Sequence, residues 1–126
     1  MFAALVPIRR CLDFSGRSDR TEFWSFSLLV AVVAALSYGL MNVGFLLIGS
    51  DLYYMDVSLL LSRLGVVTAW TAAVLFSLPM LALTVRRLHD IDESGWLVVI
   101  AFIPLGVFVL FPVMLLPGSE EANRYG

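Results

Sequence analysis

The side chains best suited to chemistry lie close together between residues 86 and 96. His89 is the only histidine of the chain, and three carboxylates follow it at Asp90, Asp92 and Glu93. A histidine among carboxylates could bind a metal ion or act as a general acid–base pair. However, this spacing matches no recognised hydrolytic or metal-binding motif, and a lone histidine beside an aspartate more often makes a fixed hydrogen bond. We therefore expect no metal, cofactor or catalysis here, and a pH sensor is a second hypothesis because imidazole groups titrate near neutral pH.

Charged residues of both signs gather in two segments, 14–24 and 86–96. Our first interpretation is structural: carboxylates of one segment pair with arginines of the other and lock two helices together. The expected pairs are Glu22 with Arg86 or Arg87, and Asp90 with Arg17 or Arg20. In the second interpretation, the arginines bind the phosphate of an anionic lipid headgroup or of a phosphorylated ligand. The candidate cluster consists of Arg17, Arg20, Glu22, Arg86, Arg87, His89 and Asp90.

The composition shows what kind of element carries these segments. The 126 residues are 60% hydrophobic and 14% charged, with a mean hydropathy of +0.93. No Asp, Glu, Lys or Arg occurs in residues 23–50, 64–85 or 94–119. A soluble fold of this size could not bury three such stretches, so the sequence predicts an integral membrane protein. A soluble enzyme, a disordered regulator and, at a net charge of −2, a nucleic-acid-binding protein with a basic face are all excluded.

Three windows are long and apolar enough to cross a bilayer as helices, since about 20 helical residues span its hydrocarbon core. Backbone groups inside hydrocarbon must bond within their own segment, which favours helices over strands. We therefore predict an all-α integral membrane bundle with three transmembrane helices plus a short N-terminal interfacial helix. The predicted single domain, 1–126, consists of an interfacial stretch at 1–22, spans at 23–48, 64–85 and 96–116, and a polar tail at 117–126.

The placement of arginines predicts the orientation, because positive charge is enriched on the cytoplasmic side of membrane proteins. Six arginines flank the same ends of the first two spans, at positions 9, 10, 17, 20, 86 and 87, and only Arg63 and Arg124 lie on the other side. We therefore expect the N-terminus in the cytoplasm and the tail outside. The run Ile103-Pro104-Leu105-Gly106 leaves open a re-entrant third segment, which would return the tail to the cytoplasm.

Helices in lipid associate through small residues that let their backbones approach closely. Small residues recur at four-residue steps on one face of each of the first two spans. They are Ala31, Ala35 and Gly39 in the first span, and Ala69, Ala73 and Ser77 in the second. We predict that these two ridges meet, and a homodimer through either ridge is the alternative.

Three motifs follow one another along the chain. They are Phe14-x-Gly16-Arg17-x-x-Arg20-x-Glu22-Phe23-Trp24, then Arg86-Arg87-Leu88-His89-Asp90-x-x-x-Ser94-Gly95-Trp96, and finally Gly118 with Asn123-Arg124-Tyr125-Gly126. This combination resembles the Domain of Unknown Function 805 family of small bacterial inner-membrane proteins, from Cys11 to Gly126. The resemblance implies a multi-pass bundle in the bacterial inner (plasma) membrane, and it implies no activity.

The expected function is binding or assembly, as a scaffold that acts through the charged cluster at the cytoplasmic membrane surface and is not an enzyme. The expected partners are the lipid bilayer, anionic lipid headgroups, and a second copy or another membrane protein, with no nucleic acid. The alternative is a lipid- or small-ligand-handling protein, such as a minor transporter or a lipid-modifying enzyme. Lipid or phosphate beside the arginines would favour this alternative, and a closed set of ion pairs would count against it.

Overall fold

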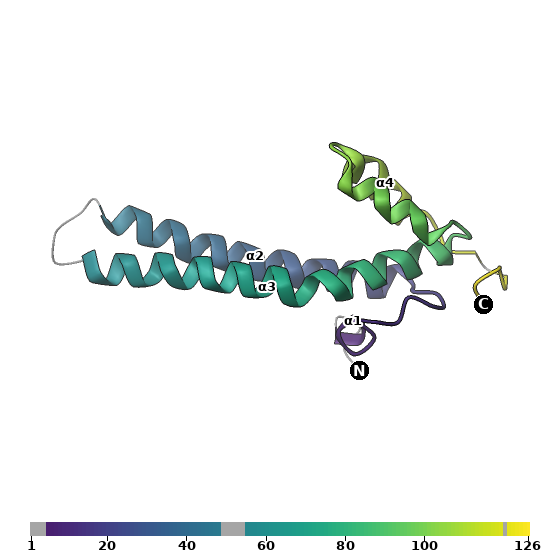
Figure 1. Cartoon of the computed structure of the whole chain (residues 1–126), viewed down its shortest axis with the longest axis horizontal. Helices are drawn as coiled ribbons and strands as arrows, with labels where there is room; N and C mark the ends of the chain where they lie inside the picture. Colours follow the sequence, from purple (N-terminus) through teal and green to yellow (C-terminus); the bar gives the residue numbers. More distant parts are fainter. Residues whose placement is uncertain (1–4, 49–54, 120) are drawn as a thin grey trace. The chain divides into compact units, whose positions relative to one another are not determined.

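The computed structural model describes residues 5–48, 55–119 and 121–126, and all regular elements within them are helical. In chain order these are α1 (Val6–Arg9), α2 (Arg20–Ile48), α3 (Met55–Asp90), the 3-10 helix η3 (Gly95–Phe102) and α4 (Gly106–Leu115), as Figure 1 shows. The predicted all-α class is therefore confirmed for the described residues, among which no strand occurs.

The helices are shared between two compact units. The hairpin unit, Leu28–Phe76, contains most of α2 and the first part of α3. The cap unit, Met1–Ser27 with Ser77–Gly126, contains α1, the start of α2, the end of α3, η3 and α4. All residues of the predicted charged cluster belong to the cap unit, whereas the predicted packing residues other than Ser77 belong to the hairpin unit.

Two glycines set the closest approach of α2 and α3 within the hairpin unit. A methyl group added at Gly65 would lie 2.6 Å from the Met41 nitrogen and 2.7 Å from the Ser37 carbonyl oxygen. A methyl group added at Gly44 would lie 2.6 Å from the Ser58 carbonyl oxygen. The Ser37 and Ser58 hydroxyls donate to carbonyls of their own helices at 2.9 and 2.6 Å, so they do not hold the helices apart. The two backbones are therefore in near contact, as small residues permit in membrane helix pairs.

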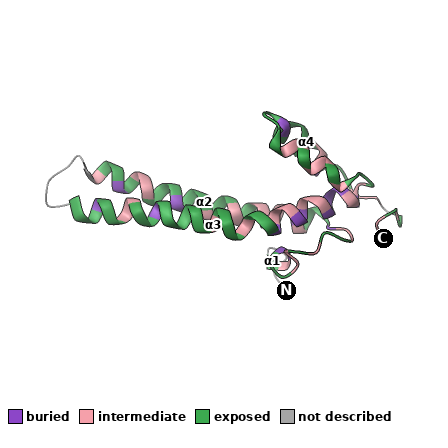
Figure 2. Cartoon of the chain, viewed as in Figure 1, coloured by how far each residue is buried: buried purple, intermediate pink, exposed green. Residues whose placement is uncertain are grey.

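The buried positions of the hairpin unit follow a seven-residue spacing. Ser37 and Gly44 are buried in α2, and Ser58 and Gly65 are buried in α3, while most residues around them are exposed (Figure 2). A seven-residue repeat keeps one seam of a helix against its partner in left-handed packing. The ridges at four-residue steps lie off this seam, and the structure leaves them exposed instead of bringing them together. The exposed ridge residues of this unit are Ala31, Ala35, Gly39, Ala69 and Ala73.

The two long helices extend beyond the apolar windows. The helix α2 begins three residues before the first predicted span and ends with it at Ile48, whereas α3 extends the second span, 64–85, at both ends. Arg63, which lies just outside the predicted second span, is therefore helical. At about 1.5 Å per residue, the 29 residues of α2 and the 36 of α3 exceed the bilayer core of about 30 Å. Within the described ranges, these two helices are long and apolar enough to cross a membrane.

The single helix predicted at 96–116 does not form. Between η3 and α4, Leu105 has φ +67°, in the left-handed region that non-glycine residues seldom adopt. A methyl group added at Gly106 would lie 2.7 Å from the Ile100 carbonyl carbon, so α4 starts directly against η3. The chain doubles back here (Figure 1), as the re-entrant alternative requires. The prediction of a third full-length transmembrane helix is therefore not confirmed.

The short N-terminal helix that the sequence predicts forms as α1. The helix α1 has only four residues, with the buried Pro7 in its first turn, and residues 1–4 lie outside the described residues. After it, Arg10 and Asp13 form an ion pair at 2.7 Å. Hydrogen bonds from Ser15, together with the Arg10 contact, hold the pKa of the Asp13 carboxyl below its usual range. This carboxylate therefore organises the turn that leads towards α2.

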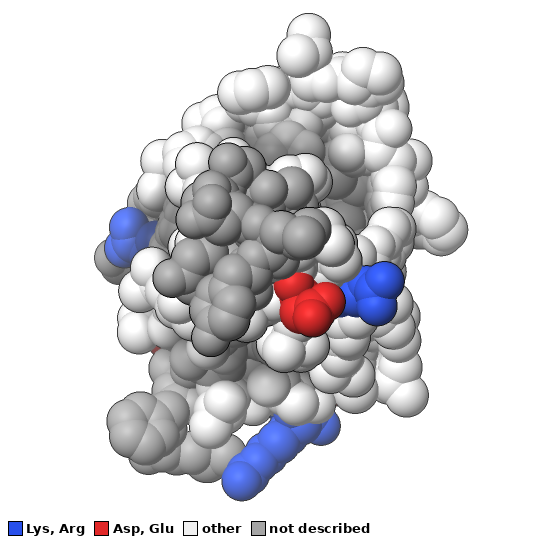
Figure 3. Space-filling view, turned by 90° about the vertical axis from the view of Figure 1, so that its left-hand side faces the viewer, with Lys and Arg blue, Asp and Glu red and all other residues white. Residues whose placement is uncertain are grey.

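Large apolar side chains cover much of the surface of each unit. Leu46 and Trp70 are 79% and 71% exposed in the hairpin unit, and Phe102 and Phe108 are 78% and 75% exposed in the cap unit. Figure 3 shows few charged side chains among the uncharged ones in one view of the molecule. Contiguous exposed apolar surface of this extent indicates contact with a membrane or a partner.

Candidate functional site

Asp90, the last residue of α3, lies at the centre of the charged cluster. Its Oδ1 accepts a hydrogen bond from Arg17 Nε at 2.9 Å, and its Oδ2 accepts one from Arg87 Nη1. The Arg87 side chain is fully buried, and Arg87 also donates through Nη2 to the Leu116 carbonyl oxygen. A single carboxylate therefore joins two guanidinium groups, one from its own helix and one from a position 73 residues away.

Each nitrogen of the Arg17 guanidinium donates a hydrogen bond within the cap unit. Its Nη1 donates to the main-chain oxygens of Glu121 at 3.1 Å and Gly126 at 3.0 Å, and its Nη2 donates to the Ser119 oxygen. A planar guanidinium with several fixed donors suits such multi-point contacts. Arg17 therefore fastens the tail to the end of α3, and its nitrogens are not free to bind a phosphate.

Arg86 forms the second buried ion pair. Its Nη2 donates to Glu22 Oε1 at 3.2 Å, and its side chain is fully buried. Glu22 lies in the first turn of α2, where its N–H donates to the capping Asp19 carboxylate at 2.6 Å. The Arg86 carbonyl oxygen accepts from Ser18 N at 3.2 Å. These contacts tie the start of α2 to the end of α3.

The sequence left open two possible arginine partners for Glu22 and two for Asp90, and the structure shows one of the two in each case. Arg86, not Arg87, pairs with Glu22. Asp90 pairs with Arg17, and Arg20 is exposed and belongs to none of the ion pairs found within the described part of the chain. The cap cluster, as we use the term below, comprises the buried or half-buried residues Arg17, Glu22, Arg86, Arg87, His89 and Asp90.

The His89 side chain is packed against the tail. Its ring stacks on the Tyr125 ring, with centroids 3.8 Å apart and an interplanar angle of 5°. Its Nδ1 lies 3.3 Å from the Gly16 carbonyl oxygen, and the His89 carbonyl accepts from Asn123 Nδ2 at 2.8 Å. Across residues 5–48, 55–119 and 121–126, no group of three His, Cys, Asp or Glu residues is placed to hold a metal ion. This geometry agrees with the interpretation of His89 as a residue with a fixed hydrogen bond.

The tail returns to the end of α3, just before the segment 95–115 that doubles back. Ser119 donates to the Asp90 carbonyl oxygen twice, from its N–H at 2.8 Å and from its hydroxyl at 3.0 Å. A methyl group added at Gly118 would lie 2.7 Å from Asp90 Cγ, so the chain passes the carboxylate at closest range. Segments in contact cannot lie on opposite sides of a bilayer. The prediction that the tail lies across the membrane from residues 86–96 is therefore wrong, because residues 95–115 double back.

An exposed ion pair accompanies the buried ones. Arg124 Nε donates to Asp92 Oδ1 at 3.1 Å, with side chains that are 67% and 47% exposed. The hydrogen bond that Arg124 donates to the Asp92 carboxylate raises the pKa of Arg124. This pair connects the tail to the loop after α3 at the surface, where water weakens the attraction.

The comparison with known proteins follows the same motifs. Residues 11–126 match the model of the family described as "Protein of unknown function (DUF805)". The chain belongs to the DUF805 family. Inner membrane protein YhaI of Escherichia coli (strain K12) is 36% identical over 123 residues, which cover 97% of this chain and 90% of that protein. Inner membrane protein YhaH of the same strain is 28% identical over 125 residues, which cover 97% and 91%. No solved structure matches the chain.

In this DUF805 protein, the three motifs of the sequence meet in the cap unit. Arg17 of the first motif and Asp90 of the second form an ion pair, while Asn123 and Tyr125 of the third contact His89. Local residue patterns alone did not place the tail in this site, although the third motif of the family resemblance lies in it, because its partners lie about 30 or more than 100 residues earlier. Nothing in the residues around Ser119 predicts its contact with Asp90, since that contact depends on how residues 95–115 double back.

Proposed function

We propose that this DUF805 protein crosses the bacterial inner membrane twice, with the cap unit at the cytoplasmic surface. Seven of its eight arginines belong to the cap unit, and only Arg63 belongs to the hairpin unit. An excess of arginine at one end of the spans is typical of the end that lies in the cytoplasm. The N-terminus and the tail would then both lie in the cytoplasm.

Residues 95–115 would enter the membrane from the cytoplasmic side and return to that side without crossing it. The eight residues of η3, at about 2.0 Å each, extend about 16 Å, and the ten of α4, at about 1.5 Å each, extend about 15 Å. Each arm reaches about half of a hydrocarbon core of about 30 Å. Arms of this length support a re-entrant hairpin and do not suffice for two further spans.

Cysteine labelling tests this topology. In a Cys11→Ser background, we expect Met55→Cys to react with a membrane-impermeant maleimide in intact spheroplasts. Ala122→Cys, which is exposed in the tail, is expected to react only after the membrane is opened. Labelling of Ala122→Cys in intact spheroplasts would place the tail outside and refute the two-span arrangement.

Within this topology we propose a binding and assembly role without catalysis, in which the hairpin unit associates with a second copy. The observation that carries this proposal is the open space at Gly39, where an added methyl group would meet nothing within 4 Å. Ala31 and Ala35, on the same face of α2, are exposed as well. Such a face lets another helix backbone approach closely. The cap cluster would fix one arrangement of the helices, as buried ion pairs can, and the exposed Arg20 would contact anionic lipid headgroups.

Association can be measured by energy transfer between donor- and acceptor-labelled copies in liposomes. Gly39→Leu blocks close approach, so we expect it to weaken association about tenfold. The matched control is Ala34→Leu, an exposed position of α2 that does not belong to the ridge of Ala31, Ala35 and Gly39, which should leave association unchanged. If the unaltered protein stays monomeric at every protein-to-lipid ratio, self-association is rejected.

Lipid or small-ligand handling is the second candidate function. Binding of phosphate at Arg17 is disfavoured because the nitrogens of its guanidinium already have acceptors within the cap unit. The observation that favours this candidate is a cavity elsewhere in the cap unit, lined mostly by apolar residues of four helices.

A further inference from the structure

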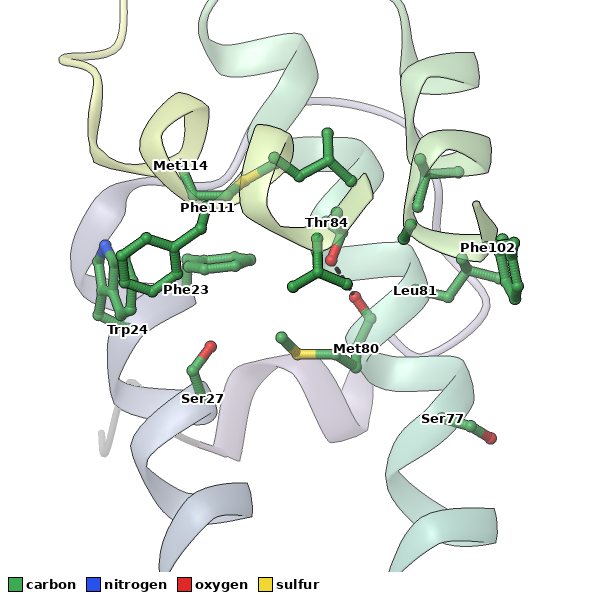
Figure 4. Close-up of a pocket in the computed structure, with 14 residues that line it drawn as sticks. Phe23, Trp24, Ser27, Ser77, Met80, Leu81, Thr84, Phe102, Phe111 and Met114 are labelled. Carbon is green, nitrogen blue, oxygen red and sulfur yellow. Dashed lines mark hydrogen bonds between the residues drawn. The ribbon is translucent and has the colours of Figure 1, made fainter. Parts of the chain in front are cut away.

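An apolar cavity of about 470 Å³ lies in the cap unit. Its walls come from the start of α2, the end of α3, η3 and α4 (Figure 4). None of its 14 lining residues is charged. Sites for small ligands typically measure about 300–1,000 Å³, so the space is large enough for a ligand of substantial size.

Aromatic and thioether side chains shape the wall. Trp24 makes edge-to-face contacts with Phe23 and Phe111, each at a centroid distance of 5.4 Å. Met80 and Met114 also line the cavity. Methionine side chains are flexible and polarizable, and they adapt to apolar partners of irregular shape. This wall suits a flexible hydrocarbon better than a polar molecule.

One polar group in the wall lacks a partner. The Ser27 hydroxyl is buried and has no hydrogen-bond partner among the described residues, whereas the Thr84 hydroxyl donates to the Met80 carbonyl oxygen at 2.7 Å. Figure 4 shows the Ser27 oxygen directed towards the space between Phe23 and Met80. A buried hydroxyl without a partner is unfavourable, so an acceptor on a bound ligand would stabilise it.

The cavity lies just beneath the ion-pair layer. Ser27 follows Glu22 by five residues, and Met80 precedes Arg86 by six, which places them about 7 to 9 Å along their helices from that ion pair. With the charged groups at the membrane surface, this depth is where phospholipid acyl chains begin. The surrounding surface is apolar too, since Phe102 and Phe111 of the cavity wall are 78% and 54% exposed.

We propose that this cavity binds one acyl chain of a bilayer phospholipid, whose ester carbonyl accepts a hydrogen bond from the Ser27 hydroxyl. The occupant follows from the apolar lining, the buried Ser27 hydroxyl without a partner and the depth below the ion pair. The inference depends on the membrane insertion proposed above, and it is independent of self-association.

Photolabelling in nanodiscs tests the proposal. The full-length protein is reconstituted in phosphatidylethanolamine and phosphatidylglycerol with a trace of phospholipid that carries a diazirine on one acyl chain. Peptide mapping is expected to find adducts concentrated at Met80 and Met114 over exposed positions such as Val74. Ala101→Phe places a large side chain in the wall, so it should lower the cavity adducts about tenfold.

The control is Ala35→Phe, an exposed site in the hairpin unit, which should leave the cavity adducts unchanged. Adducts spread evenly over the exposed apolar faces, with no effect of Ala101→Phe, would show surface lipid only and overturn the proposal. Topology labelling on the same samples distinguishes this result from a failure to insert.

A milder variant tests the hydrogen bond without filling the cavity. An ester-linked photoactivatable phospholipid is expected to label the cavity several-fold more than its ether-linked analogue, because the ether lacks the carbonyl acceptor. Ser27→Ala should abolish this preference and preserve the labelled positions. Equal labelling by the two lipids in the unaltered protein would overturn the assignment of Ser27.

Discussion

Replacing Asp90 with asparagine is expected to destabilise the cap unit strongly. The substitution leaves the fully buried Arg87 without a counter-charge and replaces the carboxylate partner of Arg17 with a neutral amide. Breaking a buried ion pair from one side typically costs about 3–5 kcal/mol, because the remaining charge stays buried. Thermal unfolding in detergent micelles measures the loss. The tail should also be released, which faster amide hydrogen exchange at Ser119 would report.

The neighbouring aspartate provides the matched control. Asp92 pairs with Arg124 in an exposed position, where ion pairs contribute little to stability. Asp92→Asn should therefore leave the unfolding temperature nearly unchanged. An equal loss of stability in the two variants would show that burial of the cap cluster is not what makes Asp90 important.

Gly65→Ala is expected to force α2 and α3 apart within the hairpin unit. Its methyl group would lie 2.6 Å from the Met41 nitrogen and 2.7 Å from the Ser37 carbonyl oxygen, and backbone atoms cannot move aside as a flexible side chain can. Overpacking of this kind typically costs about 1–3 kcal/mol. The free energy of unfolding, measured by titration with a denaturing detergent, should fall by this amount.

Gly39→Ala is the corresponding control in α2. An added methyl group there meets nothing within 4 Å, and alanine favours helices more than glycine does. We expect equal or slightly higher stability at protein concentrations where the chain is monomeric. If Gly39→Ala and Gly65→Ala lowered stability equally, close contact at Gly65 would not explain the effect.

The apolar windows predicted the long helices well and the third segment poorly. For α2, the absence of charge from residue 23 to residue 50 marks almost the whole helix. Between residues 95 and 115, hydropathy is uniformly high and carries no information about direction. The run Ile103-Pro104-Leu105-Gly106 raised a re-entrant segment as an alternative, but the reversal itself depends on the left-handed Leu105 and on the contact between Gly106 and Ile100.

The sequence predicts which residues form the charged cluster, but it only partly predicts which of them form ion pairs with one another. The three-residue spacing of Arg87 and Asp90 is visible in the sequence, and so is the position of Glu22 at a helix start. The choice of Arg17 over Arg20 depends on where the tail docks, since Arg17 also binds main-chain oxygens there. Contacts to main-chain oxygens are independent of residue type, so residue patterns cannot reveal them.

The small residues show a similar limit. Four-residue steps and seven-residue steps both place small side chains on one face of a helix. The chain contains both patterns in α2, and only the second, through Ser37 and Gly44, lies against α3. The small residues Ser58 and Gly65 of α3 determine which of the two patterns of α2 faces α3.

The hydrogen bond from Ser119 to the Asp90 carbonyl oxygen also implies an order in which the contacts form during translation. The hairpin of α2 and α3 is complete once residue 90 has left the ribosome, whereas Arg17 and Arg87 must await acceptors that are translated some 30 residues later. Until then, the two guanidinium groups share the Asp90 carboxylate but lack these main-chain acceptors. A chain that stops before Leu116 therefore never completes these hydrogen bonds, and the buried Arg87 guanidinium keeps fewer acceptors than in the finished protein.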